Sequence, residues 1–381
     1  MDVQSTHRDV FVIADNIVSP IGSTTAENIL SLKNGESGVR QHSNTNILPG
    51  TFSASLFSPS HIFLEEEGDY TKFEQLLIAS VTDAVRELSE IVSSERTLLI
   101  ISSTKGNISL LETKAHSAGL YQRIALYTSA GLVARHFGFV NTPIIISNAC
   151  ISGVVAIITG MRLLQSGDYD HAIVVGADVI SKFVLSGFGS FQALSNELCK
   201  PFDKDRKGIN LGEGAATVVL STVANNRDNL KILGGAISND ANHISGPSRT
   251  GEELAWAINE ALTEADLTNA DISFISAHGT ATLYNDEMEA NAINIAGMQT
   301  IPVNSLKGYY GHTLGAAGLI ETVVSLHSLK EGIILPTPGF QNSGVSKPLN
   351  VNAQMLKGPL TNGLKTASGF GGCNAALIFG K

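Results

Sequence analysis

The chain has 381 residues, of which 43% are hydrophobic and 16% charged, and this balance indicates a globular protein rather than a disordered one. With 35 acidic and 25 basic residues its formal net charge is -10, which argues against a general nucleic-acid or anionic-membrane surface. The three cysteines lack zinc-ligand spacing, so neither a disulfide framework nor a structural metal site is expected.

Residues 1–9 lack the charged and apolar regions of a signal peptide. No stretch of about 18 uninterrupted apolar residues occurs, so no membrane-spanning helix is expected. Sparse, unpaired cysteines fit a reducing compartment. We therefore expect a cytoplasmic protein that binds neither nucleic acid nor membrane.

Short β-branched runs alternate with longer helical stretches, which is typical of an α/β protein whose strands are buried on both faces. In the first part of the chain, strands are predicted at 10–13, 97–101, 143–147, 172–175 and 216–220. A polar stretch, 225–229, reads as a linker. Strands follow at 230–233, 272–275, 301–304 and 375–379. This pattern predicts two halves, 1–224 and 225–381.

The two halves have similar layouts. In the first, strand 143–147 precedes Cys150 and an almost wholly apolar helix. In the second, strand 301–304 precedes the loop 307–312 and another apolar helix, 314–329. Because a helix that is apolar on all sides belongs in a protein interior, both helices should lie at the centre. We expect an internal duplication, with both helix N-termini directed at one site.

Cys150 is the first candidate for chemistry, since it lies where a buried strand passes into a buried helix. A helix N-terminus favours a thiolate over a thiol and offers backbone N–H groups to an oxyanion. Position alone also suits a cysteine that only packs as a small hydrophobe.

Two histidines strengthen the catalytic interpretation of Cys150. His278 follows the buried strand 272–275, and His312 lies in a glycine-flanked loop before the second apolar helix. Ligands of α/β proteins bind at such strand exits, and Cys–His pairing is a recognised way to activate a nucleophile.

Five blocks of sequence, in order, carry a resemblance to a known family. They are 148–153 around Cys150, 200–215, 278–289 beginning at His278, 307–318 containing His312, and the glycine-rich 369–374. The chain resembles, over residues 10–381, the β-ketoacyl-acyl-carrier-protein synthases of the thiolase superfamily. The resemblance implies a thiolase-like α/β fold in which two pseudo-duplicated halves form five layers, αβαβα.

The resemblance implies a decarboxylating Claisen condensation of an acyl thioester with malonyl-acyl-carrier protein. The 3-oxoacyl product would serve fatty acid or polyketide synthesis, aryl polyenes included. Cys150 would carry the acyl group, while His278 and His312, as neutral imidazoles, would hold the malonyl thioester carbonyl. The backbone N–H groups of Cys150 and Phe370 would hold the oxyanion. No metal or redox cofactor is implied, because loss of carbon dioxide drives the reaction.

Further roles come from the same resemblance. Lys307 would tune the electrostatics around His312. Asp286 and Glu289 would belong to a polar network behind the site, with Glu289 and Lys307 acting together. Thr280 and Thr282 would bind the phosphopantetheine arm of the carrier protein.

The resemblance also assigns an acyl tunnel and partners. Phe188 would line the tunnel, and Phe370 would gate it. The partners implied are an acidic acyl-carrier protein and a second synthase subunit, in a homodimer or a heterodimer. Lys204, Arg206 and Lys207 are candidates for docking the carrier protein.

Some positions depart from the family pattern. Cys373 stands where threonine is usual, and 366–368 stands where an Asn-Ser-Phe run is usual, so Ser368 replaces an aromatic residue near the pocket. These departures leave the length and type of the acyl chain open.

Two alternatives stay open as well. One is a thiolase acting on coenzyme A thioesters, with Cys373 as a second cysteine. The other is a chain-length-factor-like subunit of a synthase heterodimer, although such subunits generally lack the nucleophile. A dinucleotide-binding enzyme is not indicated, since no Gly-x-Gly-x-x-Gly follows a strand.

Overall fold

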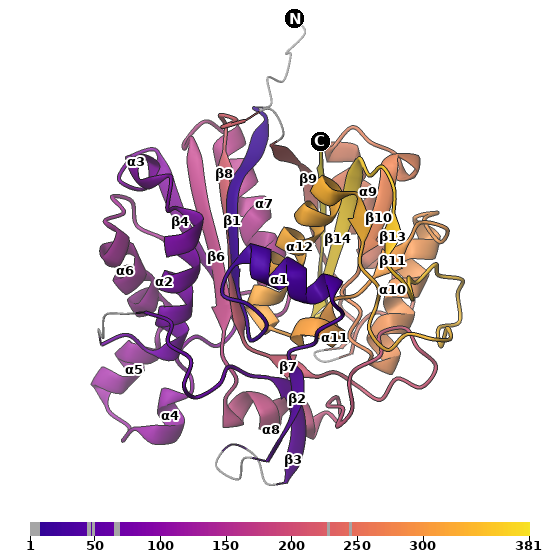
Figure 1. Cartoon of the computed structure of the whole chain (residues 1–381), viewed down its shortest axis with the longest axis horizontal. Coiled ribbons are helices and arrows are strands. Elements are labelled where there is room, and N and C mark those ends of the chain that lie inside the picture. The colour runs from indigo at the N-terminus through magenta and orange to yellow at the C-terminus, as the bar shows by residue number, and fades with distance from the viewer. Residues whose placement is uncertain (1–7, 44–46, 48–49, 65–68, 227–228, 244–245) are drawn as a thin grey trace, which may run out of the picture.

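The computed structural model shows a large mixed sheet with helices on both sides and between its two halves (Figure 1). It describes residues 8–43, 47, 50–64, 69–226, 229–243 and 246–381. Part of the predicted linker, residues 227–228, lies outside the described residues.

The sheet has ten strands in the order β11-β10-β14-β15-β9-β1-β8-β6-β4-β5. The strands from the first half of the chain are β1 (Val10–Val18), β4 (Thr97–Ser102), β5 (Ile144–Ile146), β6 (His171–Asp178) and β8 (Gly214–Ser221). Those from the second half are β9 (Leu230–Asn239), β10 (Ile272–Ser276), β11 (Val303–Asn304), β14 (Asn362–Gly369) and β15 (Cys373–Gly380).

The two five-stranded sets repeat each other. Read from the middle of the sheet outward, β1-β8-β6-β4-β5 matches β9-β15-β14-β10-β11. The pairing directions match too, because β6–β8 and β14–β15 are antiparallel while β4–β5 and β10–β11 are parallel. Antiparallel pairing of β1 with β9 joins the sets. The expected duplication is therefore present in the topology, whereas the division at 224/225 stays a prediction.

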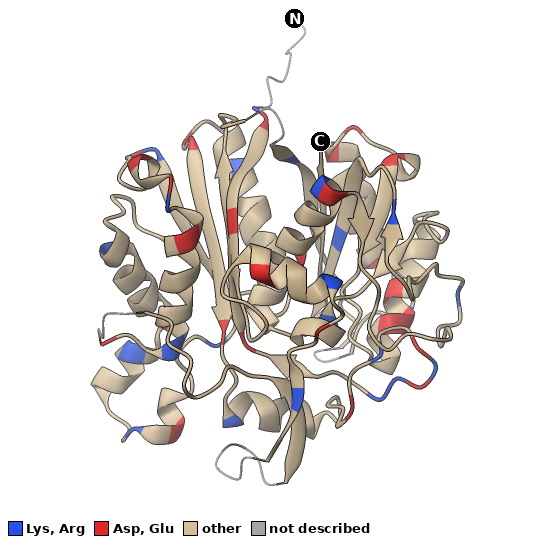
Figure 2. Ribbon diagram, viewed as in Figure 1, with Lys and Arg blue, Asp and Glu red and all other residues tan. Residues whose placement is uncertain are grey.

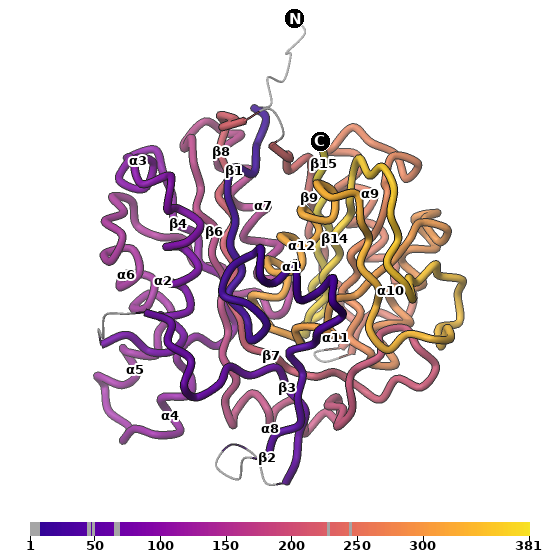
Figure 3. The backbone as a smooth tube through the Cα atoms, viewed as in Figure 1, coloured from indigo at the N-terminus to yellow at the C-terminus, as the bar shows by residue number. Residues whose placement is uncertain are grey.

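Helices fill three layers around the two sets (Figures 1 and 3). α2 (Lys72–Ala84) packs on β1, β6 and β8, and α6 (Leu126–Phe137) packs beside it. α9 (Glu252–Glu264) packs on β9 and β15, and α10 (Leu283–Ile295) packs on α9. α7 (Ser152–Gln165) and α12 (Ala317–Glu331) contact strands of both sets. The predicted thiolase-like fold of five layers is confirmed.

The shorter elements complete the chain. The remaining helices are α1 (Thr25–Lys33), α3 (Ser89–Val92), α4 (Leu110–Thr113), α5 (Ala118–Ile124), α8 (Lys182–Ser190) and α11 (Lys307–Tyr310), with 3-10 turns at Asn269–Asp271 and Leu314–Ala316. β2 (Val39–Ser43), β3 (Thr51–Ser55) and β7 (Leu211–Gly212) form a small sheet, and β12 (Ile333–Ile334) pairs with β13 (Leu356–Lys357).

The two central helices cross at glycines. A Cβ atom on Gly153 of α7 would lie 2.7 Å from the Leu319 backbone nitrogen, and one on Gly318 of α12 would lie 2.8 Å from the Val154 nitrogen. Only glycine allows the two backbones to approach this closely. Both helices thus lie at the centre, as predicted, and their N-termini face the same region between the sets.

The sequence pattern missed β14. Lys365, Thr366 and Ser368 interrupt its apolar pattern, yet all three side chains are buried. Elsewhere Figure 2 shows Lys and Arg interspersed with Asp and Glu over the described part of the chain. None of the helices in that part is long and apolar enough to cross a membrane.

Candidate active site

Cys150 lies on a tight turn between β5 and α7. Ala149, just before it, has a φ of 43°, a left-handed conformation that residues with a Cβ atom rarely adopt. The Ser152 hydroxyl accepts a hydrogen bond from the Asn148 N–H at 2.8 Å and donates one to the Ala149 carbonyl at 2.6 Å. These bonds hold the turn that places Cys150 at the start of α7.

The Cys150 thiol does not have the ionisation state expected from its position. It is 8% exposed, and burial raises the pKa of Cys150 to about 12, with a further contribution from Cys373. The predicted preference for thiolate is therefore wrong for the free protein, because loss of hydration outweighs the helix N-terminus. The resting side chain of Cys150 is therefore a thiol, and it would have to lose its proton to act as a nucleophile.

This protonation state predicts how Cys150 reacts with iodoacetamide. Since only the thiolate is alkylated, the rate should rise about tenfold per pH unit between about pH 7 and pH 9 without reaching a plateau. Mass spectrometry of the peptide that contains Cys150 follows the modification, and a Cys150→Ala variant is the blank. A plateau below about pH 8 would mean that the thiolate is stabilised after all.

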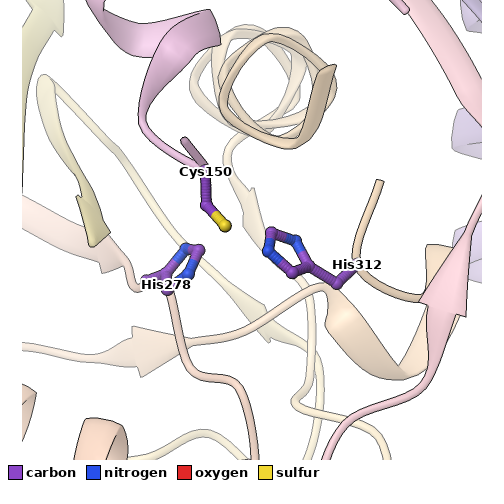
Figure 4. Close-up of side chains that lie close together, drawn as sticks. All are labelled: Cys150, His278 and His312. Carbon is purple, nitrogen blue, oxygen red and sulfur yellow. The ribbon is translucent and has the colours of Figure 1, made fainter. Parts of the chain in front are cut away.

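His278 and His312 meet at Cys150 (Figure 4). The Cys150 sulfur and the ring nitrogens of the two histidines that could act as ligand atoms lie within 4.8 Å of one another. The imidazole rings are nearly perpendicular, at 84°, with centroids 5.2 Å apart. The structure therefore brings together three side chains from distant parts of the sequence.

Both imidazoles are held neutral. Burial lowers the pKa of His278 and of His312 well below the usual value, and the charge of Lys307 lowers both further. For His312, burial is a larger cause than the charge of Lys307. Both ring nitrogens of His312 and Nδ1 of His278 make no hydrogen bond to any described residue. A neutral imidazole carries one N–H, which is thus free to bind a carbonyl oxygen.

Two buried carboxylates hold the backbone around His278. Glu289 accepts hydrogen bonds from the N–H groups of His278 at 2.8 Å and Gly279 at 2.6 Å. Asp286 accepts from the N–H groups of Thr280 at 3.0 Å and Ala281 at 3.1 Å. Burial raises the pKa of Asp286 to about 7 and also raises that of Glu289. Both residues position the His278 loop.

Lys307 and Glu289 both bind the backbone of His278, but Lys307 has another carboxylate as its ion-pair partner. Its ammonium donates to the His278 carbonyl at 3.0 Å and pairs with Glu321, not with Glu289. Lys365 pairs with the other oxygen of Glu321 at 2.7 Å. Neither Glu321 nor Lys365 was among the residues predicted for the site. A signal was present, since Glu321 is an isolated charge in an otherwise apolar helix.

β7 holds His312 in place. The His312 N–H donates to the Asn210 carbonyl at 2.7 Å, and the Gly212 N–H donates to the His312 carbonyl at 3.0 Å. A Cβ atom on Gly212 would lie 1.9 Å from the Tyr310 carbonyl oxygen, so only glycine fits. Residue 212 lies in the block 200–215, one of the five that resemble the family, and this close contact explains why it is glycine.

Gly212→Ala should therefore displace His312. The clash is with backbone, which cannot turn aside, so we expect a loss of about 1–3 kcal/mol in stability and a lower activity. Thermal unfolding and a condensation assay measure the two effects. Gly358→Ala is the matched control, because a Cβ atom there meets nothing within 4 Å. Equal behaviour of the two variants would show that β7 does not position His312.

Cys150 borders two cavities. The larger has a volume of about 600 Å³ and is also lined by His278, His312 and both threonines of the predicted pantetheine site, Thr280 and Thr282. The smaller, of about 220 Å³, has mostly apolar walls. The cavities share Phe188, Phe191 and Phe370 as lining residues.

An aromatic pair lies between the cavities. The rings of Phe188 and Phe370 stack with centroids 5.4 Å apart. A Cβ atom on Gly369 would lie 3.0 Å from the Cys150 nitrogen, so the backbone before Phe370 lies directly against the turn that holds Cys150. Ser368, which also lines the larger cavity, donates its hydroxyl to Asn374 at 2.8 Å.

The three candidate docking residues differ. Lys204 and Lys207 are exposed, and Lys207 pairs with exposed Glu197 at 2.9 Å. Arg206 is only 8% exposed and donates to the Asp203 and Gly344 carbonyls at 2.9 and 2.7 Å. The prediction that Arg206 docks a partner is therefore wrong, since its guanidinium is bound within the fold.

The Cys–His–His set also has the donor types that Zn²⁺ prefers. Its ligand atoms lie within 4.8 Å of one another, so it could hold a soft cation. The expectation that the chemistry needs no metal stays a prediction.

Comparison with known proteins shows the family. Residues 7–226 match the model described as Beta-ketoacyl synthase, N-terminal domain, and residues 230–341 match Beta-ketoacyl synthase, C-terminal domain. The chain belongs to the β-ketoacyl synthase family. The synthase is therefore an acyl-transferring condensing enzyme, and the thiolase alternative loses its support.

Relatives match the synthase over nearly its whole length. The 3-oxoacyl-[acyl-carrier-protein] synthase 2 of Vibrio cholerae is 28% identical over 409 residues, covering 98% of this chain and 99% of that protein. A solved complex of the ketosynthase ApeO with its chain length factor ApeC from Xenorhabdus doucetiae contains a similar chain, with a TM-score of 0.88, 27% identity and complete coverage of both chains. The ishigamide ketosynthase/chain length factor gives a TM-score of 0.90 at 26% identity, covering 99% of this chain and 100% of that one.

Proposed function

We propose that the synthase condenses an acyl group with malonyl-acyl-carrier protein, losing carbon dioxide, through an acyl-Cys150 intermediate. The observation that carries the proposal is the meeting of Cys150, His278 and His312 within 4.8 Å, with Cys150 lining two cavities and both histidines lining the larger one. Acyl transfer requires a neutral base beside the thiol, and either imidazole can be that base. Activation of a thioester requires N–H donors, which the two imidazoles also supply.

The first half-reaction loads Cys150. Its sulfur attacks the acyl thioester while the thiol proton passes to a neighbouring imidazole, and the carrier thiol leaves with that proton. Backbone N–H groups of Cys150 and Phe370 are proposed to hold the oxyanion that forms. Removing one such donor typically costs on the order of 10²–10³ in rate.

The second half-reaction uses the histidines as donors. N–H groups of His278 and His312 bind the malonyl thioester carbonyl, and the bond to the carboxylate breaks to release carbon dioxide. The resulting enolate carbon attacks acyl-Cys150, forming the new carbon–carbon bond and breaking the bond to the cysteine sulfur, which leaves as a thiolate and takes a proton from water. Lys307, placed behind His278, adds positive charge while the enolate is present.

We assign the cavities from their linings. The larger one, with Thr280 and Thr282, suits the pantetheine arm, and the smaller apolar one suits the acyl chain, with Phe188 and Phe370 at the boundary. Lys204 and Lys207 stay candidates for docking an acidic carrier protein. The chemistry uses no redox cofactor or metal, and the cytoplasmic location stays a prediction.

We also propose that the synthase works as a dimer, either with itself or with a related subunit. Aromatic side chains of Tyr121, Tyr127 and Phe183 are 53%, 62% and 56% exposed on α5, α6 and α8. Glu112 of α4 accepts from the N–H of Phe183 at 2.8 Å, which joins α4 to α8, and α4 contacts α5, which contacts α6. Exposed aromatic groups of this kind mark protein interfaces. Because Cys150 and both histidines are present, this chain would be the catalytic subunit rather than the chain-length-factor-like one.

An assay that offers two substrates tests the proposal. The purified chain is given acyl-acyl-carrier protein with malonyl-acyl-carrier protein, and separately acetoacetyl-coenzyme A with coenzyme A. We expect a 3-oxoacyl product and stoichiometric carbon dioxide only from the first. Thiolysis of acetoacetyl-coenzyme A without decarboxylation would contradict the proposal.

A further inference from the structure

The smaller cavity beside Cys150 contains one charged side chain among its lining residues. Its walls are formed by Ala149, Phe183, Val184, Gly187, Phe188, Phe191, Leu314 and Phe370, together with Cys150, Thr104 and Lys105. Of the two polar residues other than Cys150, Thr104 donates its hydroxyl to Asp178 at 3.0 Å. Lys105 is therefore the lining residue of this cavity whose side chain carries a charged donor not already bonded to a carboxylate.

The backbone at Lys105 is rigidly fixed. The buried carboxylate of Asp178, at the end of β6, accepts hydrogen bonds from the N–H groups of Thr104 at 3.0 Å, Lys105 at 3.2 Å and Gly315 at 2.7 Å. Asp178 thus ties the loop after β4 to the turn before α12. The backbone at Lys105, next to the cavity, is thus held by hydrogen bonds to a buried carboxylate.

The Lys105 ammonium has few partners inside the protein. Its single hydrogen bond to a described residue is to the Thr104 carbonyl at 3.5 Å, the outer limit for such a bond. No carboxylate of the described residues forms an ion pair with it, although eleven other lysine or arginine side chains do have such pairs. An ammonium group has three donors, so at least two are available to an occupant of the cavity.

We propose that Lys105 selects an acyl group that carries an oxygen acceptor, such as a carboxylate, ketone or hydroxyl oxygen, away from the thioester carbonyl. The inference rests on the proposed function, because it takes the smaller cavity as the acyl site. An alkyl chain would displace water from the ammonium without replacing its hydrogen bonds, which is costly in an apolar cavity. An acyl group with a suitably placed oxygen restores one charge-assisted bond and fills the aromatic walls.

The test compares acyl-pantetheine thioesters in pairs of equal chain length, one ending in a methyl group and the other in a carboxylate or ketone. Acylation rates of Cys150 are followed by intact-protein mass spectrometry in the wild type, in Lys105→Met, and in Lys182→Met. Lys182, on α8, is an exposed lysine near the cavity that does not line it. Using the ratio of rates within a pair removes any effect of Lys105 on the reactivity of the thiol itself.

We expect the wild type and Lys182→Met to prefer the oxygen-bearing member by roughly tenfold or more, and Lys105→Met to lose or reverse that preference. A wild type that prefers the alkyl member, or a ratio unchanged in Lys105→Met, would overturn the inference. A Lys105→Met variant that changes only subunit association would also overturn it, since Lys105 would then pair with a partner subunit. If no thioester acylates Cys150, the proposed function fails too, so the two failures are distinguishable.

Discussion

Cys150→Ala is expected to abolish condensation while leaving decarboxylation of malonyl-acyl-carrier protein measurable. Condensation requires the acyl thioester on Cys150, so its rate should fall by on the order of 10³ or more. Decarboxylation requires only N–H donors to the malonyl carbonyl, and alanine leaves His278 and His312 in place. Separate assays for 3-oxoacyl product and for released carbon dioxide measure the two steps.

Cys199→Ala is the matched control for this variant. Cys199 is also buried, at 1% exposure, but it lines neither cavity that borders Cys150. It should keep both activities. Condensation that persists in Cys150→Ala, in a preparation free of any second synthase subunit, would place the nucleophile elsewhere.

Replacing His278 or His312 with alanine should reduce the rate of decarboxylation, which Cys150→Ala leaves measurable. Loss of one N–H donor to the developing enolate is expected to reduce decarboxylation by about 10²–10³ in His278→Ala and in His312→Ala. His171→Ala is the control, since His171 is at the opposite end of β6 from Asp178, which lies close to Cys150. A decarboxylation rate within about threefold of wild type in His312→Ala would contradict the assigned role, because the expected loss is far larger.

The pH profile gives a second readout of the same role. Burial lowers the pKa of both histidines well below 6.5, so they stay neutral through mildly acidic pH. Decarboxylation should therefore persist as the pH falls through 6.5, and its acidic limb should lie well below that value. The same shift makes the unfolded chain bind more protons than the folded one below pH 6.5, so the stability that these histidines contribute falls in acid. If the decarboxylation rate instead falls with a midpoint near pH 6.5, the imidazoles have the pKa of hydrated histidines, and this contradicts the prediction.

Local patterns in the sequence predicted much of the fold. Apolar β-branched runs indicated β1, β4, β6, β8 and β10, because strands buried on both faces have continuous apolar patterns. The two apolar helices indicated the central layer for the same reason. β14 was missed because Lys365 and Thr366 are polar, and only their distant partners, Glu321 and Glu289, explain their burial.

In the site, as in the fold, local sequence patterns predicted some features, whereas features that depend on contacts distant in the chain could not be predicted. Cys150, His278 and His312 could be picked out because each follows a strand or precedes a helix, and because their blocks resemble a family. The raised pKa of the Cys150 thiol could not be predicted from the sequence, since it depends on the burial of Cys150 by segments that are distant in the chain. The partner of Lys307 and the enclosed guanidinium of Arg206 also depend on contacts between residues far apart in the chain.

The acyl-enzyme itself is the most direct test of this account. The wild-type chain is incubated with acyl-acyl-carrier protein, digested, and mapped by tandem mass spectrometry before and after malonyl-acyl-carrier protein is added. We predict one acyl group on the peptide that contains Cys150, attached at that sulfur, which disappears as the 3-oxoacyl product forms. An acyl group on any other residue, or product formation with Cys150 never acylated, would contradict the account.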